Sequence, residues 1–159
     1  MPWGISIFVL LGALALLLLS AGIEDARTRE IANWKNLAIA LLAPLWWWAH
    51  GLQLWPDIAL QIAVAIVVFA LFCIPYARGW MGGGDVKMIG ALALWCIDLR
   101  ALAWLLILMS LIGGALTLVL LIDQWRRGKS GPIEVPYGVA IAIAALCAIH
   151  EPIFNQFPR

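Results

Sequence analysis

Charged residues are scarce in this chain: Asp, Glu, Lys and Arg make up only 12% of its 159 residues, whereas hydrophobic residues make up 65%. A soluble globular domain carries roughly 25% charged residues, so the composition argues against that class. The net charge is only +1, without the basic stripe that marks a nucleic-acid-binding protein. We therefore expect a protein embedded in a lipid bilayer and no nucleic-acid partner.

Cysteine is also rare. Cys73, Cys96 and Cys147 each lie inside an apolar run and are far apart in the sequence. Zinc sites and redox motifs need closely paired cysteines, such as CxxC. We expect three free thiols, and we expect neither a metal ion nor a cofactor.

Long apolar runs, in contrast, recur along the chain. A helix needs roughly 20 apolar residues to cross a hydrocarbon core. Six runs reach or approach this length, at about 3–22, 35–52, 56–77 and 101–122, with shorter ones at 86–97 and 136–150. The sequence predicts an all-α polytopic membrane protein with about six transmembrane helices.

Basic residues in the short connections predict the orientation, because Lys and Arg are retained on the cytoplasmic side. With the N-terminus outside, only Arg100 and Arg159 would lie outside. The cations that would lie inside are Arg27, Arg29, Lys35, Arg78, Lys87, Arg126, Arg127 and Lys129. Tryptophans at several predicted span ends agree with this arrangement, and we interpret Trp46-Trp47-Trp48 as a further interfacial belt.

The run at 86–97 is too short to cross a bilayer unaided, because 12 helical residues rise only about 18 Å. Non-helical backbone at membrane depth is tolerated where it lines a water-filled cavity. The preceding Met81-Gly82-Gly83-Gly84 is therefore expected to line such a cavity. This places Asp85 at the mouth of a wet pocket.

Two acidic positions fall on the predicted cytoplasmic side, Asp25 just after the first run and Asp85 after the glycines. Two facing carboxylates that share one proton can hydrolyse a peptide bond without a metal or a nucleophile. Simpler interpretations remain open: Asp85 as a helix cap, and Asp25 as a solvated acid beside Arg27 or Arg29. Neighbouring helical residues point about 100° apart, so we do not expect Glu24 to share the role of Asp25.

The glycine run also suits a protease, because backbone without side chains can approach an extended substrate closely. We therefore expect Gly82, Gly83 and Gly84 to contact the substrate.

Three segments together resemble the bacterial prepilin peptidases. Gly82 to Lys87 matches every fixed position of the GxGDxK motif, which carries the second catalytic aspartate of that family. The first aspartate lies in a D-x-R-x-R-x-I-P-N pattern, to which the segment from Asp25 to Asn33 is similar except for Ala32 in place of proline. Val135-Pro136-Tyr137-Gly138 resembles the segment that opens the last span of the family.

The resemblance implies a GxGD-type aspartic endopeptidase with Asp25 and Asp85 as its catalytic residues and with Lys87 beside the substrate. Its substrate would be a type IV prepilin-like precursor, with a basic leader peptide and an apolar N-terminal helix. Cleavage would take place on the cytoplasmic side of the bacterial inner membrane. The chain is similar to the compact Tad or Cpa type that serves Flp pili and lacks a methyltransferase region. We expect a single peptidase domain over residues 1–159 and make no prediction of oligomeric state.

Two other classes of membrane protein stay open from the residues alone. Acids near a membrane also mark proton or cation paths, as in a small transporter component. Ser110 and Gly114 offer a small-xxx-small packing face of the kind used by structural membrane subunits. The sequence has no inverted repeat and no acid in the middle of a predicted span, which argues against a transporter.

Overall fold

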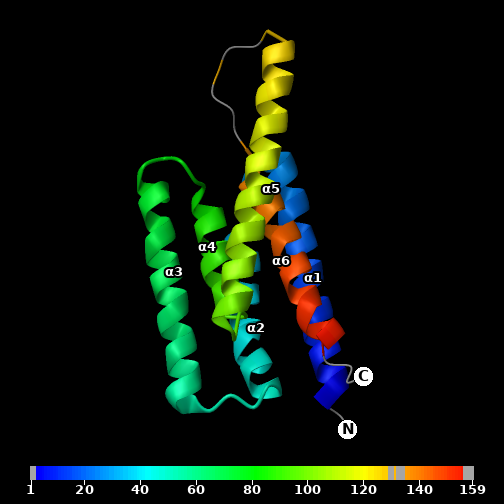
Figure 1. Ribbon diagram of the computed structural model, residues 1–159, viewed down its shortest axis with the longest axis vertical. Helices are drawn as coiled ribbons and strands as arrows, with labels where there is room; N and C mark the ends of the chain where they lie inside the picture. Colours follow the sequence, from blue (N-terminus) through cyan, green and yellow to red (C-terminus); the bar gives the residue numbers. More distant parts are fainter. Residues whose placement is uncertain (1–2, 129–130, 132–134, 156–159) are drawn as a thin grey trace.

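Helices account for the regular structure of the computed structural model, which describes residues 3–128, 131 and 135–155 and contains no strand within them (Figure 1). The helices are α1 (Trp3–Thr28), α2 (Asn33–Ala49), α3 (Ala59–Ala77), α4 (Gly83–Ala93), α5 (Leu99–Arg126) and α6 (Tyr137–Asn155), with a short turn η1 (Leu54–Ile58) before α3. The predicted all-α class is confirmed, and six α-helices lie within the described residues. That all six cross a membrane stays a prediction.

Three helical segments among the described residues are long and apolar enough to cross a membrane: Ser6–Thr28, Leu54–Ala77 and Leu99–Arg126. The other helices are shorter, since α2 has 17 residues, α4 has 11, and the apolar part of α6 is Tyr137–Ala148. Length and composition therefore support three of the six predicted transmembrane helices.

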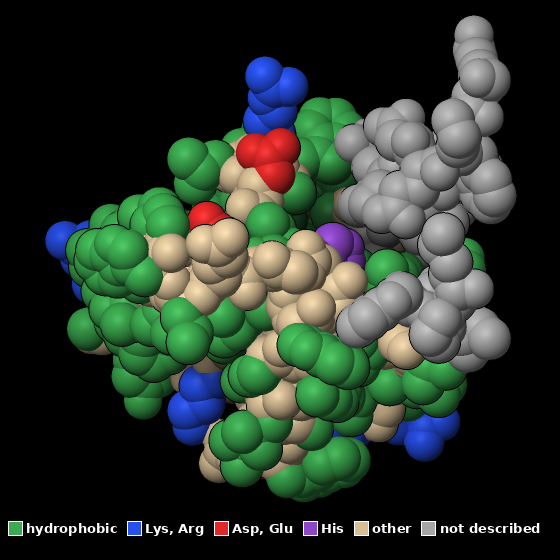
Figure 2. Space-filling model, turned by 90° about the horizontal axis from the view of Figure 1, so that it is seen from below, with side chains coloured by type: hydrophobic (Ala, Val, Ile, Leu, Met, Phe, Trp, Pro, Cys, Tyr) green, Lys and Arg blue, Asp and Glu red, His purple; other side chains and the backbone are tan. Residues whose placement is uncertain are grey.

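The outer surface of the bundle is strongly apolar. Leu16, Leu111 and Val119 are more than 60% exposed, as are several other large side chains. Figure 2 views the end of the bundle at which α1 begins, and hydrophobic side chains are prominent there while charged ones are few. A surface of this kind suits a lipid environment, because a soluble monomer rarely exposes large apolar patches.

The short helix α4 lies inside the bundle, between α2, α3 and α6. Its side chains Met88, Ile89 and Leu92 are almost completely buried. They join a core to which α1 contributes Leu14 and Leu18. This packing fixes the position of α4, and with it the position of Asp85 in its first turn.

The inner end of α4 has hydrogen-bond partners although it stops inside the bundle. A helix leaves its last carbonyl groups without backbone partners, and in a membrane these must be satisfied internally. Side-chain N–H groups do so: Trp47 donates to the carbonyl of Leu94 (2.7 Å), Trp46 to that of Trp95 (3.1 Å), and Gln61 to those of Ala93 (2.7 Å) and Cys96 (2.8 Å).

This arrangement corrects the interpretation of Trp46-Trp47-Trp48 as an interfacial belt. Trp46 and Trp47 are only 6% exposed and point into the bundle, and Trp48 alone is exposed. Three consecutive tryptophans cannot share one face of a helix, because successive residues are rotated by about 100°.

Both acidic segments lie at the end of the bundle away from the start of α1 (Figure 1). α1 continues to Thr28, six residues beyond the apolar run that predicted it, so Asp25 lies on the helix rather than after it. The helix ends where Arg29 adopts a left-handed backbone conformation with φ of 60°, a common way to terminate a helix.

Two cations used in the orientation argument, Lys129 and Arg159, lie outside the described residues.

Candidate active site

Asp25 is buried near the end of α1 and faces the start of α6. Its side chain is only 4% exposed, and its Oδ2 accepts a hydrogen bond from the Val139 backbone N–H at 3.3 Å. The first turn of a helix carries N–H groups without partners and a partial positive charge, so it favours a carboxylate. The simpler interpretation of Asp25 as a solvated acid is therefore wrong. Among the described residues Asp25 forms no ion pair with Arg27 or Arg29, although Arg29 lines the same cavity.

Gly138 makes this contact possible. A Cβ atom at position 138 would lie 2.9 Å from Cγ and Oδ2 of Asp25, closer than real Cβ atoms approach other groups. The Val135-Pro136-Tyr137-Gly138 segment therefore brings α6 against Asp25. The sequence identified this segment only through the family resemblance and assigned it no part in the site.

Asp85 is the third residue of α4 and is only 8% exposed. Burial raises the pKa of its carboxyl to about 7, and the nearby charge of Asp25 acts in the same direction. A hydrogen bond from the Gly82 backbone opposes this rise in pKa. Gly82 is the N-cap of α4, so the interpretation of Asp85 as the cap is wrong, although an acid in the first turn still stabilises the start of a helix.

The two carboxyl groups line one cavity of about 350 Å³. Its lining consists of Asp25, Arg29, Glu30, Ile31, Gly82, Gly83, Gly84 and Asp85. The structure thus brings together both predicted catalytic residues and the three predicted glycines, although sixty residues separate the aspartates. Gly83 and Gly84 belong to the first turn of α4 rather than to a loop, and Met81 packs against the core.

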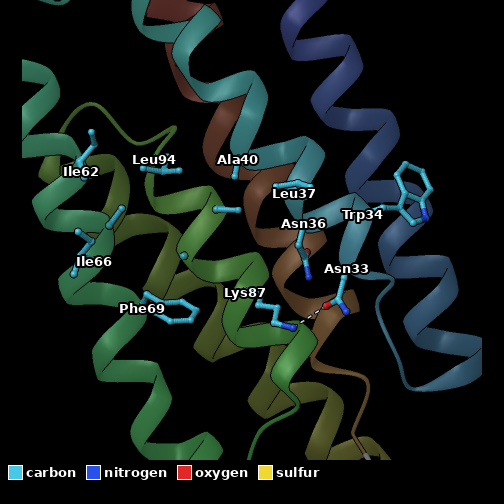
Figure 3. A pocket seen from close by; sticks show the side chains of 13 residues that line it. Asn33, Trp34, Asn36, Leu37, Ala40, Ile62, Ile66, Phe69, Lys87 and Leu94 are labelled. Carbon is cyan, nitrogen blue, oxygen red and sulfur yellow. Dashed lines mark hydrogen bonds between the residues drawn. The ribbon is translucent and has the colours of Figure 1, made fainter. Parts of the chain in front are cut away.

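Lys87 lies on a different side of α4 from the cavity. Its Nζ donates a hydrogen bond to Oδ1 of Asn33 at 2.7 Å, as the dashed line in Figure 3 shows. Asn33 and Lys87 are the last matched positions of the two aspartate motifs. This contact therefore joins the two motifs directly.

Ile31 fills the space between the segments that carry the site. A Cβ atom on Gly84 would lie 3.1 Å from Cβ of Ile31, and one on Gly138 would lie 2.7 Å from its Cδ1. The sequence predicts contact between a substrate and Gly84, but Ile31 occupies the space beside this glycine. Gly84 therefore serves first to let the segment after α1 approach α4, while its backbone still lines the cavity.

Glu24, the neighbour of Asp25, anchors the same segment. Its Oε2 accepts hydrogen bonds from the Ala32 backbone N–H and from Nζ of Lys35, both at 3.0 Å. Lys35 is only 6% exposed and also donates to the carbonyl of Ser20 at 3.0 Å. These bonds tie the end of α1 to the start of α2. The ion pair of Glu24 with Lys35 was not predicted from the sequence. The available signal was an acid and a lysine on either side of a short connection between two helices.

Residues 12–119 match the family model of the type IV leader peptidases, with Asp25 and Asp85 both inside the matched region. The chain belongs to the type IV leader peptidase family. Its members hydrolyse peptide bonds, so the family together with the three long apolar helices makes this chain a membrane peptidase. No curated protein and no solved structure matches it significantly.

The anchor formed by Glu24 and Lys35 gives a first prediction. Glu24→Gln removes the negative charge and leaves a buried ammonium group poorly compensated, which destabilises a fold. We expect a lower Tm in detergent and a several-fold lower peptidase activity, because the segment that carries Ile31 is held less firmly.

The exposed pair Asp123 and Arg127 supplies the control, since Asp123→Asn breaks an ion pair that solvent screens. Combining Glu24→Gln with Lys35→Gln should cost less than the sum of the single changes, because the double variant has no unpaired charge. If the double variant lost as much stability as the two single variants together, the anchoring role of the pair would be contradicted.

The raised pKa of Asp85 gives a second prediction. Its pKa is about 7 in the folded protein and about 3.9 in an unfolded chain. Between these values the folded state binds more protons, so the free energy of unfolding falls as the pH rises. We expect the Tm in detergent to fall between about pH 4 and pH 7, and Asp85→Asn to remove much of that fall. An unchanged pH dependence in Asp85→Asn, matching that of Asp123→Asn, would contradict the burial of an acid at this position.

Proposed function

We propose that this chain is an aspartic endopeptidase that removes the basic leader peptide from type IV prepilin-like precursors of the Flp or Tad type. The observation that carries the proposal is the shared cavity, in which two buried carboxyl groups from distant parts of the chain face the same space. The peptidase domain comprises the whole chain, residues 1–159.

The two aspartates divide the acid and base roles. Asp85, with a pKa of about 7, keeps its proton in a large fraction of molecules at neutral pH and donates it toward the oxygen of the scissile carbonyl. Asp25, in its ionised form, takes a proton from water, whose oxygen forms the new bond to the carbonyl carbon. Collapse of the tetrahedral intermediate breaks the C–N bond: the leaving amine takes the proton from Asp25. The hydroxyl formed from the carbonyl oxygen returns its proton to Asp85 as the C=O bond re-forms, so both aspartates regain their starting forms.

The surroundings of the cavity support binding of a leader peptide. Glu30 lies in the cavity lining beside the two aspartates, and this gives a basic leader acidic groups to approach. Arg29 offsets part of this charge. The glycines of the α4 start leave backbone at the cavity surface, where an extended chain can approach.

The location of the cavity follows from the charge distribution. Arg27, Arg78 and Arg126 lie at the ends of α1, α3 and α5, on the side of the bundle that holds the cavity, and Arg29 lines the cavity itself (Figure 1). Arg100 lies at the start of α5, away from the cavity. By the retention of Lys and Arg inside the cell, the cavity faces the cytoplasm from the bacterial inner membrane. All six helices then enter the bilayer, with the start of α4 at its cytoplasmic surface and the end of α4 inside it.

The catalytic proposal is tested with Asp25→Asn and Asp85→Asn, each produced with a co-expressed precursor. Acid and base catalysis contributes about 10²- to 10⁴-fold each, so each amide variant should lose processing by at least about 100-fold while staying in the membrane. Asp57→Asn, at the other end of the bundle, is the matched control and should process normally. Processing at the wild-type rate by either cavity variant would refute the two-aspartate mechanism.

The orientation is tested with topology reporters fused after residues 54 and 99, which should report the outside, and after residues 30 and 80, which should report the inside. The expectation rests on the distribution of Lys and Arg. A cytoplasmic signal from position 54 would place the acid cavity on the outer side of the membrane.

A further inference from the structure

A second hollow, larger than the acid cavity, lies on α4. It is an apolar groove of about 700 Å³ between α2 and α3 (Figure 3). Leu37 and Ala40 on α2 and Ile62 and Ile66 on α3 form its walls, and Gly90 on α4 lies in its floor. Leu37 and Ile66 are 58% and 62% exposed, so the groove opens toward the lipid.

The groove reaches the acid cavity at the start of α4. Asn36, which lines the groove, donates from Nδ2 to the carbonyl of Gly84 at 3.0 Å, and Gly84 lines the cavity. Asp85 and Lys87 point about 200° apart around the helix, so Asp85 faces the cavity while Lys87 lines the groove. A single helical turn separates the two hollows.

Asn36 carries an acceptor without a donor. Its side chain is only 4% exposed, and its Oδ1 has no hydrogen-bond partner within the part of the chain that the structure describes. Figure 3 shows its amide pointing toward the end of the groove at which Lys87 lies. A buried acceptor left without a partner is unfavourable, and the residue that carries this acceptor lines the groove.

We propose that this groove seats the apolar helix of the precursor, so that the chain passes from the groove over the start of α4 into the acid cavity. The proposal rests on the proposed function and adds to it the surface that recognises the substrate. As the precursor enters the cavity it must be extended, and an extended chain exposes one N–H group per residue. One of these N–H groups is the donor for Oδ1 of Asn36.

The unpaired acceptor favours this occupant over the two alternatives. A lipid acyl chain fills an apolar groove but brings no hydrogen-bond donor. A helix from a second copy of this chain keeps its backbone N–H groups in its own hydrogen bonds. A precursor that changes from helix to extended chain beside Asn36 supplies both an apolar surface and a free donor.

Photo-crosslinking tests the proposal without requiring cleavage. A photoreactive benzoylphenylalanine replaces Leu37 or Ile66 in the groove, or Leu118 on the exposed face of α5 as the control. Each full-length variant is co-expressed with a precursor that has a basic leader and an apolar helix of about 20 residues. We expect crosslinks to the precursor from positions 37 and 66 and none from position 118.

A groove-filling variant gives an independent measurement. Ala40→Phe places an aromatic ring in the groove, and Ala115→Phe places the same ring on the exposed face of α5. We expect Ala40→Phe to lower both the crosslinking yield and the rate of processing by about tenfold, which corresponds to ~1.4 kcal/mol of lost binding. Ala115→Phe should keep both at the wild-type level.

The outcomes separate this proposal from the proposed function. Crosslinks between two copies of the chain from positions 37 and 66 would assign the groove to a dimer contact. If positions 37 and 66 gave no crosslink to any protein, the result would indicate that lipid fills the groove. Either result overturns the docking proposal, even if Asp25→Asn and Asp85→Asn abolish cleavage. Precursor crosslinks together with full processing by those two variants would instead refute the aspartic mechanism and keep the docking surface.

Discussion

The connection between α1 and α2 contacts every element that completes the acid cavity. Ile31 lies against the glycine at the start of α4 and the glycine at the start of α6, at distances that exclude a Cβ atom on Gly138 and crowd one on Gly84. Glu24 holds the same connection through Ala32 and Lys35. The relative position of the two aspartates therefore depends on packing around one isoleucine, because Asp25 faces α6 and Asp85 lies on α4.

The membrane imposes a second constraint, since backbone groups inside it must find partners within the protein. α4 has only 11 residues and ends inside the bundle. Its end is tolerated because the indole N–H groups of Trp46 and Trp47 and the amide of Gln61 bond to carbonyls there. The other end of α4, which carries Asp85, lies beside a polar cavity.

Much of this organisation could be predicted from the sequence, because hydropathy and motif spacing are local properties. All six helices and the meeting of Asp25 with Asp85 were predictable in this way. The roles of Glu24, Ile31 and Gly138 were not, since they depend on contacts between segments up to 114 residues apart. The indoles of Trp46 and Trp47 were misinterpreted for the same reason. A tryptophan near the end of a predicted span is typical of the membrane interface, and the sequence does not show that a carbonyl group from another segment accepts its N–H.

The first turn of α4 explains how one short helix serves two hollows of opposite character. Asp85 and Lys87 are two residues apart, so helix geometry sends their side chains to nearly opposite sides. On one side Asp85 and Asp25 line a polar cavity, and on the other Lys87 and Asn33, joined by a hydrogen bond, lie at the end of an apolar groove. The proposed function needs this combination, because a precursor with an apolar helix would arrive from lipid while the hydrolysis reaction requires water.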